Sequence, residues 1–188
     1  GDGCPSRSFT DLNTGVWYHP YTDYVISHSL MRGLSSTLFA PNQSMTRGMM
    51  VTTLYRLAGE PQVEGTATFQ DVKSSAYYAN AVAWAEANGI AKGIDTGVFA
   101  PNAPVTREQA AAFAYRYVTA YLGKTPVPGA SLGGFQDAGL VSDYAAESLS
   151  WAHAAGLMVG YGDGFLGPKD TVTRAQMAKL LTLLAQNF

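Results

Sequence analysis

The sequence predicts a mainly α fold: three two-helix repeats in a pseudo-threefold arrangement around a shared central three-helix bundle. Three observations predict it. A set of residues recurs three times in register along the 188-residue chain. Each copy contains two segments with the composition or the apolar spacing of a helix. The hydrophobic fraction of 47% is enough for a core, but one copy of about 55 residues is too small to bury a core of its own.

Each repeat begins with a phenylalanine followed two positions later by an aspartate. Asp11 and Asp71 lie 60 positions apart, and Asp137 follows after 66 more. Two aromatic residues, a glycine and a threonine-arginine pair then recur in each copy: Trp17, Tyr24, Gly33, Thr46 and Arg47; Tyr77, Trp84, Gly93, Thr106 and Arg107; Tyr144, Trp151, Gly160, Thr173 and Arg174. We therefore expect an N-terminal extension at 1–8 and repeats at 9–60, 69–124 and 135–188, which fold as one cooperative domain.

The first helix of the second repeat is expected from about Tyr77 to Asn88, because this segment is rich in alanine. It should end at Gly89, a residue suited to the position after a helix. Gly156 has the same place in the third repeat, whereas the first repeat has Ser29 there. The tryptophans inside these helices are expected mainly in the core.

The second helix of each repeat is expected to begin after a threonine, which is a favourable N-cap residue. Gln109 and Gln176 stand three positions after two of these threonines and complete a capping box. Met49 has this place in the first repeat and cannot form one. An apolar face at helical spacing then recurs in all three copies.

Composition and charge exclude several classes of protein. A net charge of −2 gives no electrostatic basis for binding nucleic acid, and no apolar run approaches the roughly 18 residues of a membrane-spanning helix. Cys4 is the single cysteine, so neither a disulfide framework nor a zinc cluster is expected. We predict no cofactor, no metal site and no catalytic residue, because no nucleophile has a matched base and no repeated acid pair suits glycoside hydrolysis.

The motifs of the second repeat resemble the S-layer homology repeat, and the resemblance extends from Phe9 to the C-terminus. It rests on Phe69-Gln70-Asp71-Val72, Tyr77 to Val82, Gly89-Ile90, Phe99-Ala100-Pro101-Asn102 and Val105 to Ala110. Such repeats in tandem form the cell-surface anchoring module of bacterial S-layer proteins and surface enzymes. The resemblance implies a pseudo-trimer with a central bundle and grooves between its prongs. It also implies a secreted protein at the cell wall.

The resemblance implies binding of a secondary cell-wall polysaccharide, often through a pyruvylated amino sugar. In that family the arginine of a threonine-arginine-alanine-glutamate motif faces the groove, which points to Arg47, Arg107 and Arg174 in this chain. The alternative is a protein–protein assembly module of a surface lattice. Because the chain starts with Gly1, we also expect it to be part of a longer surface protein with a covalently linked further domain.

The three arginines also suggest anion binding on physical grounds. Each follows a helix N-cap, where the positive end of the helix dipole disfavours a cation by roughly 0.3–1 kcal/mol. A nearby anion would offset this repulsion, and free N–H groups of the first turn together with a guanidinium suit a carboxylate. The other interpretation is that each arginine pairs with the aspartate of a repeat and ties a loop to a helix.

The remaining candidate ligand residues each have two open interpretations. Asp11, Asp71 and Asp137 either stabilise turns or accept sugar hydroxyls. Three aromatic residues either stack on a sugar or pack in the core: Trp17, Tyr77 and Tyr144. Three glycines either permit close approach of a ligand or supply a positive φ: Gly33, Gly93 and Gly160. Motif quality predicts unequal grooves, with Arg47 the least important arginine because Gly48 and Met49 follow it.

Overall fold

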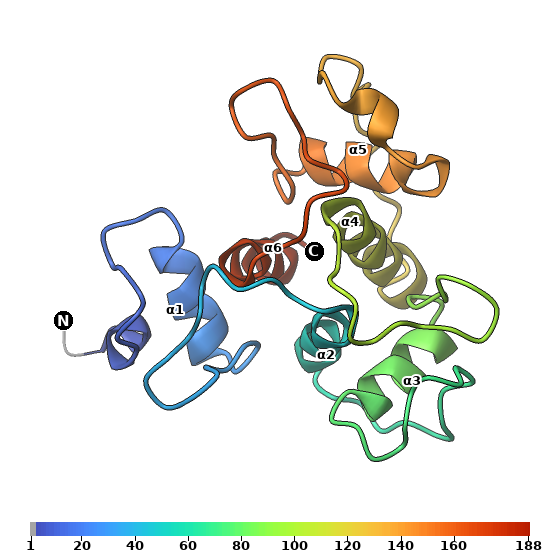
Figure 1. The fold of residues 1–188 in the computed structure, drawn as a ribbon, viewed down its shortest axis with the longest axis horizontal. Helices are drawn as coiled ribbons and strands as arrows, with labels where there is room; N and C mark the ends of the chain where they lie inside the picture. The colour runs from blue at the N-terminus through green and yellow to red at the C-terminus, as the bar shows by residue number, and fades with distance from the viewer. Residues whose placement is uncertain (1–2) are drawn as a thin grey trace.

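The computed structural model describes residues 3–188 and confirms the mainly α fold (Figure 1). The first helices of the repeats are α1 (His19–Ser27), α3 (Ala79–Ala87) and α5 (Ala146–Ala154). The second helices are α2 (Arg47–Leu57), α4 (Arg107–Arg116) and α6 (Arg174–Asn187). Short 3-10 helices are η1 (Pro5–Ser8), η3 (Ala138–Leu140) and η4 (Asp143–Ala145), and α4 continues as a π-helical turn, η2 (Tyr117–Tyr121). The extension predicted at 1–8 is described from residue 3 onward.

The second helices begin as the sequence predicts. The side chains of Thr46, Thr106 and Thr173 each accept a hydrogen bond from the backbone N–H three residues later. The capping boxes with Gln109 and Gln176 are both present. Two residues after each first helix ends, the backbone takes a positive φ, at Ser29 (56°), Gly89 (72°) and Gly156 (75°).

The helices pack across repeats, and the contacts run in a cycle. The first helix of each repeat lies against the second helix of the preceding one, so α3 packs on α2, α5 on α4, and α1 on α6. Figure 1 shows α2, α4 and α6 around the centre of the molecule, with α1, α3 and α5 outside them. This cyclic order is the one that a pseudo-threefold arrangement requires. The symmetry itself stays a prediction.

A ring of backbone hydrogen bonds joins the three segments that enter the central helices. The N–H of Met45 donates to Val172 at 2.8 Å, that of Val172 to Val105 at 3.0 Å, and that of Val105 to Met45 at 2.9 Å. All three side chains are buried. Because each repeat donates to one neighbour and accepts from the other, no repeat completes its own hydrogen bonding.

The core is shared by the three repeats. Val25, Met50, Phe113, Leu149 and Leu181 are buried and belong to one apolar cluster. Trp84 and Trp151 are also in the core, as predicted, each 3% exposed. Among residues 3–188, no helix combines the length and apolarity that crossing a bilayer would need.

Candidate functional site: the junctions between repeats

The three arginines lie at the junctions between repeats, where each reaches from one repeat into the next. Arg47, Arg107 and Arg174 are the first residues of α2, α4 and α6 and are 3–6% exposed. Their Nε atoms donate to backbone carbonyls at 2.8, 3.0 and 2.7 Å, and the acceptors are Phe99, Leu166 and Phe39. Each guanidinium therefore fastens the turn of the following repeat, with the third repeat joined to the first.

A second nitrogen of each guanidinium contacts the loop before the repeated glycine. The Nη2 of Arg47 donates to the carbonyl of Lys92 at 3.4 Å, and Arg107 and Arg174 make the equivalent bonds to Val159 and Arg32. No ion pair joins these arginines to the repeated aspartates within residues 3–188. The arginine–aspartate pairing considered above is therefore wrong: the arginines hold carbonyls.

The helix N-termini are not free to bind an anion, which corrects the expectation from the sequence. At α2 the N–H groups of Arg47 and Gly48 donate to the carbonyls of Ala103 and Pro101 in the next repeat, at 2.9 and 2.8 Å. The corresponding groups of α4 and α6 are satisfied in the same way. Side-chain caps satisfy the third N–H of each helix. What remains for a ligand at these junctions is the guanidinium and the pocket around it.

The repeated aspartates stabilise the turns that the arginines hold. The carboxylate of Asp71 accepts from the N–H groups of Phe99 and Ala100 at 2.9 and 2.8 Å, and Asp11 and Asp137 make the same pair of bonds in their repeats. The turn role is thus confirmed. Hydrogen bonds from two backbone N–H groups lower the pKa of Asp137 below its ordinary value.

The repeated glycines are explained by close packing and not by backbone strain. Gly33, Gly93 and Gly160 are absent from the positive-φ residues, so that interpretation is wrong. A Cβ at Gly33 would lie 2.3 Å from the Phe9 ring, and one at Gly93 would lie 2.5 Å from the Val98 carbonyl. The positive φ falls instead on the turn residues Ala40, Ala100 and Gly167, where the sequence does not indicate it.

The three repeated aromatic residues are on the surface and not in the core. Trp17, Tyr77 and Tyr144 are 55%, 65% and 53% exposed. Tyr144 lines a pocket of about 520 Å³ with Arg47, and Tyr77 lines one of about 260 Å³ with Arg174. Trp17 lines neither of these two pockets. A stacking role is therefore open to all three by exposure, and two of them stand beside a buried arginine.

The larger pocket is built from all three repeats. Arg47 comes from the first repeat, Lys92, Gly93 and Arg116 from the second, and Tyr144 from the third. A buried glutamate, Glu108, also lines it and forms an ion pair with Lys169 and hydrogen bonds with Ser142. Sequence comparison of single repeats cannot find this pocket, because no repeat contains more than part of it.

The smaller pocket is built from the equivalent positions, each taken from the preceding repeat in the cycle. Arg32, Gly33 and Arg56 replace Lys92, Gly93 and Arg116, and Arg174 replaces Arg47. No carboxylate lines it. Burial lowers the pKa of Arg174, and the charge of Arg56 acts in the same direction. Because guanidinium stays protonated in proteins, these clustered charges repel one another, and a bound anion would relieve the repulsion.

The third junction has a different composition. At the positions of Lys92 and Arg116 it has Val159 and Leu183. The ring of Tyr161 lies 4.7 Å from the guanidinium carbon of Arg107, and its hydroxyl donates to Asp170 at 2.8 Å. Burial and this hydrogen bond raise the pKa of Tyr161 to about 12. Arg107 lines neither of the two pockets.

The comparisons with known proteins agree with this repeat structure. The sequence profile of the S-layer homology domain matches residues 8–49, 68–111 and 134–178. These matches begin within one residue of the predicted repeats; the full extents of the repeats stay a prediction.

Three relatives show the range of proteins that contain similar sequence. The chain is 33% identical to an endoglucanase of Bacillus sp. (strain KSM-635) over 94% of this chain and 18% of that protein. It is 30% identical to an amylopullulanase of Thermoanaerobacterium thermosulfurigenes over 93% and 9%, respectively. It is 30% identical to the surface-layer 125 kDa protein of Lysinibacillus sphaericus over 87% and 14%. The chain thus spans less than a fifth of each of these relatives. It belongs to the S-layer homology domain family and is a cell-surface anchoring module made of three such repeats.

Proposed function

We propose that this chain anchors a longer secreted protein to a bacterial cell wall by binding the anionic sugar of a secondary cell-wall polysaccharide. The observation that carries the proposal is the pair of pockets that contain Arg47 and Arg174. Each has at least three cationic side chains and an exposed aromatic ring at its edge. A carboxylate on a sugar, such as a pyruvate ketal, satisfies guanidinium donors while the ring covers an apolar sugar face.

The two pockets support binding without catalysis. Chemical transfer at a glycosidic bond needs an acid and a base at separated pKa values. The acid that lines the larger pocket, Glu108, is 2% exposed and already paired with Lys169 and Ser142. The smaller pocket is lined by no acid. We therefore propose a non-enzymatic module whose parent protein supplies any activity.

Two pockets on one chain would strengthen retention through multivalency. When one sugar is bound, the second pocket meets the next sugar of the same polymer at a high effective concentration. Weak single sites can then hold a protein on the wall. Of the three junctions, we propose that those at Arg47 and Arg174 bind the sugar and that the junction at Arg107 has a structural role.

The proposal is tested by sedimentation of the chain with purified cell walls, before and after chemical removal of the polymer. Retention on intact walls and loss on stripped walls is expected. Equal retention on both would contradict anchoring through the polymer. Self-association of the chain without any wall, measured by analytical ultracentrifugation, is the outcome that would favour the alternative of a lattice-assembly module.

A further inference from the structure

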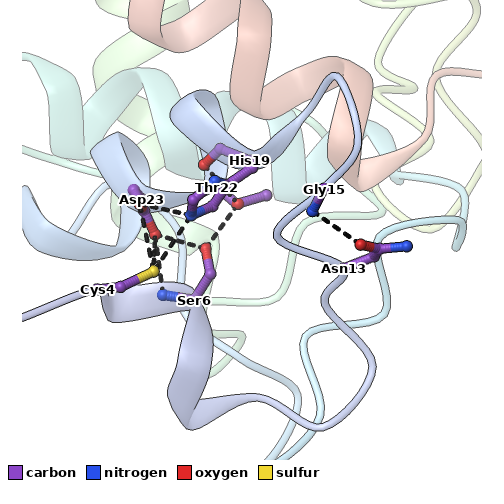
Figure 2. Close-up of polar contacts among 7 residues, drawn as sticks. All are labelled: Cys4, Ser6, Asn13, Gly15, His19, Thr22 and Asp23. Carbon is purple, nitrogen blue, oxygen red and sulfur yellow. Dashed lines mark hydrogen bonds and ion pairs between the residues drawn. The ribbon is translucent and has the colours of Figure 1, made fainter. Parts of the chain in front are cut away.

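A group of metal-ligating side chains lies away from the junctions, between the N-terminal segment and α1 (Figure 2). Cys4 directly precedes η1, and His19 and Asp23 lie one helical turn apart on α1. The Cys4 sulfur, the His19 Nε2 atom and a carboxylate oxygen of Asp23 all lie within 4.8 Å of one another. The sequence shows a single cysteine and no metal-binding spacing, so it does not predict this group.

The distances fit a small tetrahedral metal ion. Cys4 Sγ is 3.2 Å from His19 Nε2 and 3.6 Å from Asp23 Oδ2, and His19 Nε2 is 2.9 Å from Asp23 Oδ2. Sulfur, nitrogen and oxygen ligands of tetrahedral zinc are roughly 3.4–3.6 Å apart, given metal–ligand bonds of about 2.0–2.3 Å. On zinc binding, the distances between the three ligand atoms would each have to increase by about 0.5 Å or less to reach these values.

The arrangement does not fit a nucleophile with its base. In a catalytic triad, one ring nitrogen of the histidine faces the nucleophile and the other faces the carboxylate. Here both the thiol and the carboxylate lie within hydrogen-bonding distance of the same nitrogen, His19 Nε2. Three atoms that converge in this way suit one shared central atom.

The carboxylate is held in place by a neighbouring serine. Asp23 Oδ1 accepts from the backbone N–H of Ser6 at 2.9 Å and from its hydroxyl at 2.6 Å, and the Ser6 hydroxyl also contacts Thr22 at 2.8 Å. Asp23 Oδ2 is left facing His19. Such outer contacts orient metal ligands before a metal binds.

The other repeats provide a comparison for the same place on the scaffold. In the second repeat, Ala79 and Ala83 have the positions of His19 and Asp23, and they line a hollow with residues 65–67 of the preceding linker. In the third repeat, Ser150 at the aspartate position donates to the carbonyl of Ala130 at 2.5 Å. A segment lies against the first helix in every repeat, but within residues 3–188 a group of three potential metal ligands is found at this place in the first repeat alone.

We propose that Cys4, His19 and Asp23 bind a zinc ion that joins the N-terminal segment to α1. Cys4 binds as the thiolate, His19 through Nε2 and Asp23 through Oδ2, and a water molecule takes the fourth position. His19 and Asp23 are 29% and 27% exposed, so an ion can enter from solvent. The site is independent of the polysaccharide pockets.

The test is titration of the reduced chain with zinc by calorimetry, under a non-thiol reductant, together with thermal unfolding. One zinc per chain is expected, with a rise in Tm of about 5–10 °C at a zinc concentration a hundredfold above Kd. Cobalt(II) used as a probe should give the thiolate-to-metal charge-transfer absorption.

Cys4→Ser and Asp23→Asn should abolish zinc binding and the cobalt signal, while Ser6→Ala should weaken zinc affinity by about 10–100-fold. His19→Gln should likewise abolish zinc binding, and His28→Gln is its matched control, because this exposed histidine lies just after α1 and packs on Tyr24 instead. The proposal is overturned by an absence of stoichiometric binding to the wild-type chain, or by binding that survives Cys4→Ser.

Discussion

The three junctions between repeats share one scaffold but differ in the walls of their pockets. At every junction an arginine at the start of a central helix donates to two carbonyls of the next repeat. Beside Arg47 and Arg174 the walls add cations, Lys92 and Arg116 in one case and Arg32 and Arg56 in the other. Beside Arg107 the same positions are Val159 and Leu183.

The difference separates what the arginine does for folding from what it does for binding. All three guanidiniums are buried and hydrogen-bonded, so the motif alone is explained by joining repeats. At all three junctions burial is the main cause that lowers the pKa of the arginine, and tyrosine or aspartate side chains act in the opposite direction. The junctions differ in that a second arginine, Arg116 or Arg56, adds to the lowering at Arg47 and Arg174, whereas no cation does so at Arg107.

The largest effect is expected when a junction is broken. Deleting residues 135–188 removes α5 and α6 and opens the ring of hydrogen bonds among Met45, Val105 and Val172. Because the core is shared, the remaining repeats should lose cooperative thermal unfolding in calorimetry. A sharp, native-like transition of the truncated chain would mean that the repeats fold independently.

Charge reversal in the two cationic pockets should be next in size. The double substitution Arg32→Glu and Lys92→Glu changes two exposed side chains whose backbone carbonyls, not their charges, serve the scaffold. Loss of a charged hydrogen bond costs about 1.5–3 kcal/mol, so we expect the affinity for a pyruvylated saccharide to fall at least about tenfold.

The control for charge reversal is Lys124→Glu, at an exposed lysine that lines neither pocket. It should bind as the wild type does. If the control and the double variant lose the same affinity, general charge and not the pockets controls binding.

The aromatic residues allow the junctions to be compared one at a time. Tyr144→Ala should weaken saccharide binding by about fivefold to tenfold if stacking contributes about 1 kcal/mol or more. Trp17→Ala is the matched substitution at the equivalent position of the first repeat, which lines neither pocket, and it should leave affinity unchanged. An equal loss in both variants, measured by calorimetry, would show that all three junctions bind.

The smallest effect is expected on the pH dependence of thermal stability, through the aspartate that stabilises a turn. The pKa of Asp137 is lower in the folded state than in the unfolded state, where it is about 3.9. The Asp137 carboxylate therefore stabilises the folded protein fully above about pH 3.9, and this stabilisation is lost as the pH falls through the folded-state pKa. Asp137→Asn should therefore lower Tm at pH 7 and flatten the dependence of Tm on pH below about 4. An unchanged acid profile would contradict this role for the carboxylate.

The sequence predicts the helices well because their signals are local. Threonine caps, glutamine capping boxes and apolar spacing are read within a few residues, and the structure confirms them. It predicts the arginine partners poorly because these come from the following repeat: Arg47 bonds to Phe99 and Arg174 to Phe39. Such contacts depend on how the repeats are arranged in space.

The ranking of the grooves also depends on contacts between repeats, which the sequence of one repeat does not contain. Motif quality places Arg47 last, since Gly48 and Met49 follow it. The structure places Arg47 in the larger pocket, whose other walls come from the better-matched repeats. The pocket geometry therefore predicts that Arg107, and not Arg47, contributes least to saccharide binding. Cys4, His19 and Asp23 were missed for a related reason, because the contact between the N-terminal segment and α1 has no local signature.

The central claim is that two of the three junctions bind an anionic sugar. The most direct test is calorimetric titration of the intact chain with a short pyruvylated saccharide, alongside the same saccharide without its ketal acid. We predict two sites per chain for the acid and an affinity loss of at least about tenfold without it. Three equivalent sites, or equal affinity for both saccharides, would contradict the account.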